Sequence, residues 1–262
     1  FFALLLGIAV TMLPENKGKP LIRFFEALSD TMIKTVHIVM KMAPLGVFAL
    51  IAVVVGKFGT DILVSLLKYT LVVLLGLGIH IFLTYSTAIR LFANYSFFKF
   101  LKGIRPAQLI AFSTSSSSAT LPVTIECCEE NLGVSEKISS FVLPLGATIN
   151  MDGTALYQGV AAIFIAQVYG IPLTIINQLT IVLMATLASI GAAGVPGIGI
   201  ITLAMVLETI GVPLEGIALI LGVDRLIDMC RTTVNITGDS SCALIIGASE
   251  KELIVEKRNN KR

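Results

Sequence analysis

The sequence carries little charge, and one long stretch of it carries none. Of its 262 residues, 14% are charged and 55% are hydrophobic, whereas soluble domains contain roughly 25% charged residues. No charged residue occurs from Gly153 to Leu207, a stretch long enough for two bilayer crossings of roughly 20 residues each. The composition argues against a soluble domain and predicts a polytopic protein whose surroundings are the lipid bilayer.

Residue patterns that build metal centres and catalytic sites are also scarce. The four cysteines, Cys127, Cys128, Cys230 and Cys242, have no metal-ligand spacing with the two histidines, His37 and His80. The lone His80 in an apolar run is expected to be a satisfied or interfacial side chain. The serine run 113–118 lacks a G-x-S-x-G elbow, and "GVPGIG" lies outside any strand–helix unit. We therefore expect neither an enzyme nor a nucleic-acid-binding protein.

Hydropathy divides the chain into apolar segments. They are the end of one span over 1–13, spans over about 24–56 and 62–93, a half-apolar segment over about 97–130, an apolar stretch over about 138–168, an uncharged segment over about 172–207, and a final span over about 214–248 before a polar tail. The first is apolar from Phe1 and lacks a basic leader and a cleavage site. We expect it to be the end of a span that begins before residue 1.

Basic residues gather in alternate connections and predict the orientation. They cluster over 14–23, over 90–105 and in the tail after residue 250, but only Lys57 and Lys68 occupy the opposite side. Because basic residues mark the cytoplasmic side, we expect a plasma-membrane protein with a cytoplasmic C-terminus. Segments 97–130 and 172–207 must then each enter and leave on one side. They are predicted to be re-entrant hairpins from opposite sides.

Two small-residue stretches suit the tips of such hairpins. At a hairpin tip, backbone N–H and C=O groups lack helical partners, and lipid cannot supply them. The hydroxyls of "STSSSSATLP" (113–122) can pair with such groups, and the small glycines of "GAAGVPGIG" (191–199) let other backbone approach. Each precedes a span with a break signal, in "PLGATINMDGTALYQG" (144–159) and "DRLIDMCRTTVNITGDSS" (224–241). Two hairpins and two interrupted transmembrane helices in an all-α polytopic membrane protein are typical of an inverted-repeat transporter with a midplane site.

The final span carries the strongest functional pattern. Asp224, Asp228, Arg231, Asn235 and Asp239 are spaced by four, three, four and four residues, which places them within roughly 80° of one another on a helix. Charges at membrane depth are costly, so this ladder predicts a binding face. A purely structural Asp–Arg network is the alternative.

The residue types of this face fit an acidic amino acid. Arg231 could bind a side-chain carboxylate through its planar fork, with Asp224 orienting it. Asp228 could hold the ammonium, and Asn235 with the hairpin amides could take the α-carboxylate. Na⁺ prefers several oxygens. Asp239, Asp152 and carbonyls freed at "NMDGT" and "NITGD" would supply them.

Four motifs resemble one family over essentially the whole chain. "STSSSSATLP", "LPLGATINMDGTALYQG", "ASIGAAGVPGIG" and "DMCRTTVNITGD" are similar to those of the dicarboxylate/amino acid:cation symporters, which include the excitatory amino acid transporters and prokaryotic aspartate and glutamate relatives. The resemblance implies a homotrimer with an elevator mechanism. It assigns 1–56 to part of a static scaffold and 57–262 to a mobile transport domain.

The resemblance also implies individual site residues. Substrate contacts fall on Ser116, Ser117, Thr154, Val195 to Gly199, Asp228, Arg231, Thr232 and Asn235. One sodium site falls on Gly146, Asn150, Asn235 and Asp239. A second falls on backbone at Thr148, Ser189, Ile190 and Ala192, near Met151, and a third on Asn150 and Asp152.

The chain departs from the family in two respects. Members usually have about three further N-terminal spans, which supply part of the scaffold and of the third sodium site. Many members place an extra arginine near the site, where this chain has Ser115 or Met229.

The leading hypothesis is secondary active uptake of aspartate or glutamate coupled to Na⁺. Proton coupling is the alternative for the cation, because some bacterial relatives use protons. A C4-dicarboxylate substrate would leave Asp228 without an ammonium. An ion channel with hairpin filters is a remote alternative, because no symmetric carbonyl ring is present. The sequence does not rank aspartate against glutamate.

Overall fold

The computed structural model describes residues 2–253, and their regular structure is helical apart from one isolated bridge pair between Val134 and Leu253. The chain forms two compact units, residues 1–46 and 47–262. The coarse prediction of an all-α protein is confirmed. The predicted C-terminal tail lies mostly outside the described residues.

The first unit contains α1 (Phe2–Thr11) and α2 (Glu15–Met40), and α3 (Ala43–Phe58) crosses the boundary between the units. Pro14 precedes α2 with an extended backbone, a residue that cannot continue the hydrogen bonding of a preceding helix. The stretch 24–56, which we predicted to be one span, is instead divided between α2 and α3 by a turn at Lys41–Met42. Hydropathy could not show this turn because both flanks are apolar.

One continuous helical segment, Asp61–Ala93, is the only described helix that is both long and apolar enough to cross a membrane. It matches the prediction of a span over about 62–93. The segment begins as α4 (Asp61–Ile79) and widens into the π-helical η1 (His80–Tyr85). It continues through α5 (Ser86–Ala88) and the π-helical η2 (Ile89–Ala93), which ends at Asn94.

The serine run separates two helices, α6 (Phe97–Thr114) and α7 (Ser117–Glu126), which pack against each other. Ser115 has a φ of +53°, and Ser116 caps α7 by accepting a hydrogen bond from the N–H of Ala119 at its Oγ. Serine suits this position because its side chain can replace a missing intrahelical acceptor. The π-helical η3 (Cys127–Asn131) follows.

The break predicted in "NMDGT" is present between α8 (Glu136–Ile149) and α9 (Asp152–Val168), where Asn150 and Met151 are not helical. Next come α10 (Ile175–Ile190) and α11 (Ile198–Thr209), joined by the glycine-rich stretch 191–197. The short 3-10 helix η4 (Leu214–Gly216) leads into the last helix.

The last helix, α12 (Ile217–Ser249), is continuous, so the predicted interruption of the final span is wrong. Its "NITGD" carbonyls therefore stay in the helix and are not freed. Gly238 has another role there, because a Cβ at this position would lie 2.5 Å from Asn150 Nδ2 and 2.6 Å from Tyr85 Oη. The glycine permits a close approach of neighbouring side chains instead of ending the helix.

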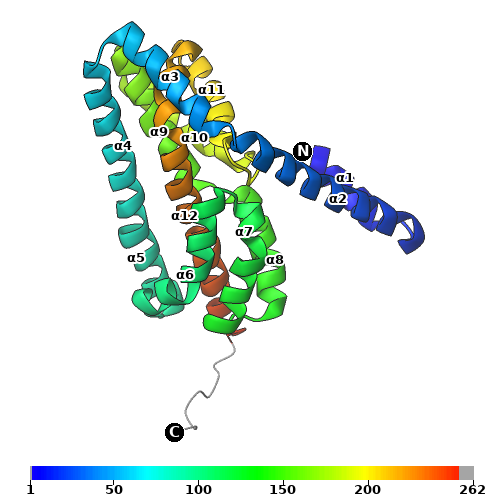
Figure 1. Cartoon of the computed structure of the whole chain (residues 1–262). Coiled ribbons are helices and arrows are strands. Elements are labelled where there is room, and N and C mark those ends of the chain that lie inside the picture. Colours follow the sequence, from blue (N-terminus) through cyan, green and yellow to red (C-terminus); the bar gives the residue numbers. More distant parts are fainter. Residues whose placement is uncertain (1, 254–262) are drawn as a thin grey trace. The chain divides into compact units, whose positions relative to one another are not determined.

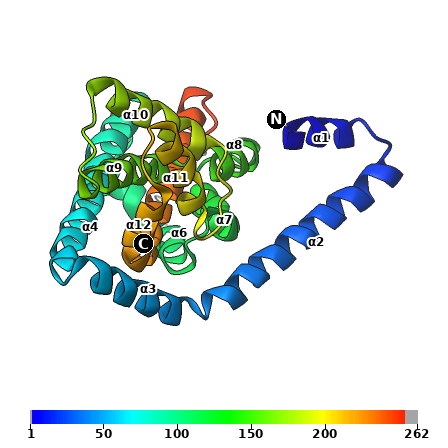
Figure 2. The same cartoon turned by 90° about the horizontal axis from the view of Figure 1, so that it is seen from above.

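Helix α12 forms the centre of the second unit (Figures 1 and 2). It packs against α4, α6, α7, α8 and α9. Its buried residues include aliphatic side chains such as Ile220, Ile227 and Leu244. They also include the polar ladder that the sequence placed on one face. The polar face therefore points into the protein, where α9 and both inter-helix tips meet it.

Candidate functional site

The guanidinium of Arg231 is the centre of the candidate site. The side chain is 1% exposed. Its Nη2 lies 2.8 Å from Asp228 Oδ1, and its Nη1 lies 3.7 Å from Asp224 Oδ1. Its Cζ stands 4.5 Å from the centroid of the Tyr157 ring on α9, a cation–π distance. Two carboxylates and one aromatic face thus stabilise a charge whose isolated burial would be costly.

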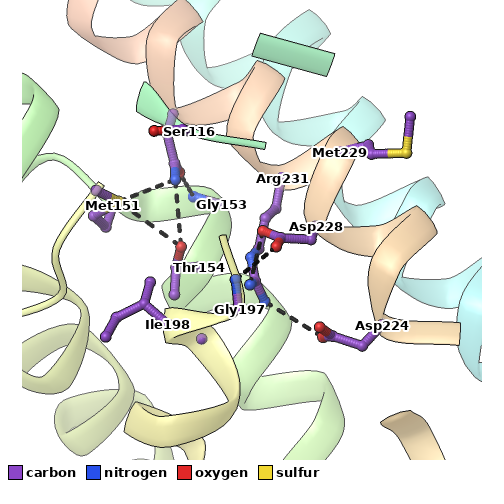
Figure 3. Close-up of polar contacts among 12 residues, drawn as sticks. Ser116, Met151, Gly153, Thr154, Gly197, Ile198, Asp224, Asp228, Met229 and Arg231 are labelled. Carbon is purple, nitrogen blue, oxygen red and sulfur yellow. Dashed lines mark hydrogen bonds and ion pairs between the residues drawn. The ribbon is translucent and has the colours of Figure 1, made fainter. Parts of the chain in front are cut away.

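The terminal nitrogens of Arg231 still have donor capacity. Nη2 is paired with Asp228 at 2.8 Å, whereas Nη1, 3.7 Å from Asp224 Oδ1, has no hydrogen-bond acceptor within the described residues. A guanidinium presents a planar fork of N–H donors that matches a carboxylate. Figure 3 shows this group lying between Asp228, Asp224 and the loop at Gly197. The arrangement is suited to receiving an anion.

The loop between α10 and α11 lies directly on α12. The backbone N–H of Gly197 donates to Asp228 Oδ2 at 2.9 Å. Gly197 has a φ of +80°, a left-handed conformation that glycine adopts without strain. The other tip contacts the same loop, because Ser116 Oγ donates to the carbonyl of Gly194 at 2.7 Å. The two predicted tips therefore meet above the polar face of the helix.

Asn235 joins this face to the beginning of α9. Its Oδ1 accepts from the backbone N–H of Gly153 at 2.9 Å, and its Nδ2 lies 3.3 Å from Thr154 Oγ1 and 3.2 Å from Met151 Sδ. The start of a helix carries partial positive charge. The break before α9 thus presents a helix N-terminus to the site.

These groups line a cavity of about 10 Å³, the space of about one water molecule. Its lining includes most of the predicted substrate residues, namely Ser117, Thr154, Val195, Asp228, Arg231, Thr232 and Asn235. Ser116 instead bonds Gly194. Gly199 lies so close to the Arg231 guanidinium that a Cβ there would overlap it.

The two positions where relatives often carry an extra arginine differ in their placement. Ser115 lines the cavity. Met229 points away from Arg231 and Asp228 (Figure 3). A charge at residue 115 would therefore enter the site directly, whereas one at residue 229 would not.

The first predicted cation set is brought together. Asn150 Nδ2 lies 2.9 Å from Asp239 Oδ1 and 3.3 Å from the carbonyl oxygen of Asn235. A Cβ at Gly146 would stand 2.6 Å from the same Asp239 oxygen. The break at Asn150–Met151 thus lies beside the one buried carboxylate of the lower part of α12. The Asp239 carboxylate and the Asn235 carbonyl are oxygen ligands of the type that hard cations prefer.

The second set lies at two helix ends. Thr148 is in the last turn of α8, Ser189 and Ile190 end α10, and Ala192 donates its N–H to the Ser189 carbonyl at 3.1 Å. Helices α8 and α10 are packed together, and Met151 is the second residue after α8. The last carbonyls of a helix lack intrahelical partners. The position suits backbone coordination.

The third set, Asn150 and Asp152, stays a prediction, because its two side chains have separate partners. Asn150 donates a hydrogen bond to Asp239. Asp152 Oδ2 instead lies 2.8 Å from His80 Nε2 and accepts a hydrogen bond from the hydroxyl of Tyr85. The expectation that His80 is a satisfied side chain is confirmed. Among residues 2–253, no three His, Cys, Asp or Glu side chains gather as a metal centre.

Sequence reasoning missed the aromatic residues of the site. Tyr157 and Tyr85 are distant in sequence from the residues that they contact, and a tyrosine in an apolar helix carries no motif. Among the cavity residues, it also missed Ala193 and Gly194, which have no side-chain chemistry that would single them out.

Comparison with known proteins identifies the family. The model of the sodium:dicarboxylate symporter family matches residues 1–249. The chain belongs to this family. It is a family of transporters and not of enzymes, so the expectation that the chain is not an enzyme is confirmed.

Individual relatives of this chain differ in their named substrates and cations. It is 45% identical over 249 residues to the proton/sodium-glutamate symport protein of Bacillus subtilis, covering 95% of this chain and 57% of that protein. It is 41% identical over 250 residues to the proton/glutamate-aspartate symporter of Escherichia coli, covering 95% and 57%. It is 45% identical over 242 residues to the mouse neutral amino acid transporter B(0), covering 91% and 43%. The chain thus spans less than two thirds of the length of each.

Proposed function

We propose that this chain forms the substrate-binding part of a secondary active symporter that takes up L-aspartate or L-glutamate together with Na⁺. This proposal rests mainly on the buried guanidinium of Arg231, which lines the cavity and whose Nη1, 3.7 Å from Asp224 Oδ1, has no hydrogen-bond acceptor among the described residues. A side-chain carboxylate would supply that acceptor as a charge-assisted pair. A neutral side chain would leave this donor unsatisfied, which is costly in a buried site.

Asp228 supports an amino acid over a plain C4-dicarboxylate. Its carboxylate already faces Arg231 on one side and Gly197 on the other, and it borders the same cavity. An α-ammonium there would add a second positive partner. A dicarboxylate would instead bring a second anion towards Asp228, and like charges repel strongly in a poorly solvated site.

The charges of the described site support cation coupling. Asp224 and Asp228 lie against the guanidinium of Arg231, and two further carboxylates, Asp239 beside Asn150 and Asp152 beside His80, have no arginine or lysine partner among the described contacts. An acidic amino acid carries a net negative charge and would increase this excess. Because uncompensated charge is costly inside a membrane protein, the anion binds favourably only together with cations.

The set around Asp239 supports Na⁺ as the cation. The Asp239 carboxylate and the Asn235 carbonyl oxygen both lie near the Asn150 amide. The oxygen and nitrogen of an amide are assigned from their partners. With the Asn150 amide turned over, its oxygen would join the two others as a third hard ligand. Na⁺ would then replace the amide N–H groups as their positive partner.

The arrangement of helix breaks supports an inverted-repeat architecture in the membrane. We propose that α6–α7 and α10–α11 are re-entrant hairpins entering from opposite sides, with residues 1–56 in a scaffold and 57–262 in the moving domain. The basic connections 14–23 and 90–105 then face the cytoplasm of a plasma-membrane homotrimer, as does the C-terminus.

The cavity size indicates that the tips must separate for binding. A space of about 10 Å³ holds about one water and is much too small for an amino acid. The contact between Ser116 Oγ and the Gly194 carbonyl joins the tips across this space. Admission of substrate therefore requires movement of at least one tip.

The test is concentrative uptake of labelled L-aspartate by the complete protein in proteoliposomes. We expect uptake with an inward Na⁺ gradient, none when choline replaces Na⁺ at fixed pH, and none in Arg231→Ala. Arg231→Lys keeps the charge but loses the planar fork, so it should retain little activity. Arg90→Ala, at an exposed arginine of η2, is the matched control and should transport normally.

Three results would contradict the proposal. Unchanged aspartate uptake in Arg231→Ala would remove the role of the guanidinium. Uptake that is driven by a proton gradient and does not depend on Na⁺ would show that the coupled cation is H⁺. Equilibration without accumulation would indicate a channel.

A further inference from the structure

The carboxylate of Asp152 is held by three donors from two elements. Its Oδ1 accepts the backbone N–H of Gly153 at 2.8 Å. Its Oδ2 lies 2.8 Å from His80 Nε2 and also accepts the Tyr85 hydroxyl. The side chains of His80 and Asp152 are 25% and 27% exposed, and Tyr85 is 6% exposed. A membrane-spanning helix thus clamps the carboxylate from one side.

The clamp depends on the π-helical turn of η1. His80 and Tyr85 are five residues apart, which on an α-helix would separate their directions by about 140° at 100° per residue. The i→i+5 hydrogen bonding of a π-helix stacks such residues on one side. Their rings are 4.8 Å apart, edge to face. The wide turn therefore lets both rings reach one oxygen.

Tyr85 also touches α12. Its hydroxyl lies 3.4 Å from the Val234 carbonyl oxygen, and a Cβ at Gly238 would come within 2.6 Å of it. The absence of a Cβ at Gly238 also makes room for Asn150, which belongs to the predicted cation set around Asp239. One hydroxyl therefore lies among the carboxylate of Asp152, the backbone of α12 and the residues around Asp239.

We propose that Tyr85, supported by His80, is a positioning residue that fixes the Asp152 carboxylate for a transported cation and thereby sets the cation affinity of the symporter. This inference rests on the proposed function. A carboxylate has about four lone-pair positions, and three donors occupy three of them. The remaining position is held in one direction, so a cation that binds there would meet a carboxylate that needs no reordering.

This role resembles that of hydrogen-bonding partners around metal ligands in general. Loss of such a partner lowers metal affinity by about 10- to 100-fold. A purely structural fastening would instead lower stability and leave the cation dependence of the folded protein unchanged. The two roles therefore differ in a measurable quantity, the half-activating cation concentration.

The experiment compares Tyr85→Phe with wild type in the complete reconstituted protein. We measure the half-activating concentration of the cation that drives wild-type uptake, Na⁺ on our proposal, and the aspartate KM at saturating cation. Tyr85→Phe should raise the first about tenfold or more and leave the second within about twofold. Tyr95→Phe, at a half-buried tyrosine before α6, removes the same hydroxyl elsewhere and should change neither.

A second pair of variants covers the case in which Tyr85→Phe does not fold. His80→Gln keeps a donor and should stay near the wild-type cation dependence, whereas His80→Leu removes it and should shift the half-activating concentration in the same direction. Na⁺ binding to the purified protein without substrate should follow the same order.

The inference is overturned if the folded Tyr85→Phe or His80→Leu variants keep the wild-type cation dependence, bind the cation more tightly, or change only the aspartate KM. These results are distinct from failure of the proposed function. That failure would be seen in the wild type and in Arg231→Ala, without reference to Tyr85.

Discussion

Asp228 on α12 accepts a hydrogen bond from the backbone N–H of Gly197 at 2.9 Å while its other oxygen lies 2.8 Å from Arg231. One carboxylate therefore links the arginine to the loop that covers it. Any movement of this loop changes the surroundings of the guanidinium, so opening of the site and its affinity for an anion are coupled.

Replacement of Asp228 by Asn should separate these two contacts. The amide oxygen can still accept from Gly197, but the negative charge opposite Arg231 and a substrate ammonium is lost. Because a hydrogen bond to a charged group contributes about 1.5–3 kcal/mol, the aspartate KM should rise about 10- to 100-fold. Inhibition by succinate, which has no ammonium, should weaken less. An unchanged KM, with exposed Asp61→Asn as control, would exclude the ammonium role.

Ser116→Ala should loosen the contact between the two tips. The change removes the α7 cap to Ala119 and the hydroxyl contact with the Gly194 carbonyl, and loss of a cap costs about 1 kcal/mol. Hydrogen exchange of residues 191–198 should become faster. Ser113→Ala, whose hydroxyl bonds only its own helix, is the matched control. Equal exchange in both variants would show that the tips are not joined by Ser116.

Gly238→Ala should disturb the neighbourhood of both Asn150 and Tyr85. The added methyl has no room, and overpacking costs about 1–3 kcal/mol, so the thermal midpoint in detergent should fall. Gly78→Ala places the same methyl on α4 in open space and should leave the midpoint equal or higher. A Gly238→Ala protein as stable as Gly78→Ala would contradict the packing around the lower part of α12.

Asp239→Asn should weaken the binding of the cation and not the binding of the amino acid. Removal of the charge next to Asn150 takes away the one ionised ligand of this set, and the half-activating Na⁺ concentration should rise at least tenfold. At saturating Na⁺ the aspartate KM should return to near the wild-type value. Uptake of labelled aspartate across a Na⁺ series measures both. A variant with normal Na⁺ dependence would place the cation elsewhere.

The sequence predicted those parts of the site that depend on local pattern. The spacing from Asp224 to Asp239 follows the helical period, and this alone placed Asp228, Arg231 and Asn235 on one face. The non-helical residues Asn150 and Met151 were predicted from the break signal in "NMDGT". The family resemblance supplied the residues of the two tips.

What the sequence did not predict depends on packing. "NITGD" resembles a break signal, but Gly238 stays helical, and its missing Cβ leaves room for Asn150 and Tyr85. Tyr157 contacts Arg231 from another helix, far away in the chain. The π-helical turn that joins His80 and Tyr85 has no sequence signature. Such contacts require the positions of neighbouring helices.

The most direct test of the account is the preference for L-aspartate over L-asparagine, which differ only in the charged side-chain group. Dissociation constants measured on the purified complete protein at saturating Na⁺ should favour aspartate by about 10- to 100-fold in the wild type, because only a carboxylate forms charge-assisted bonds with Arg231. In Arg231→Ala the ratio should fall to near one. A preference for aspartate that survives this substitution would contradict the account.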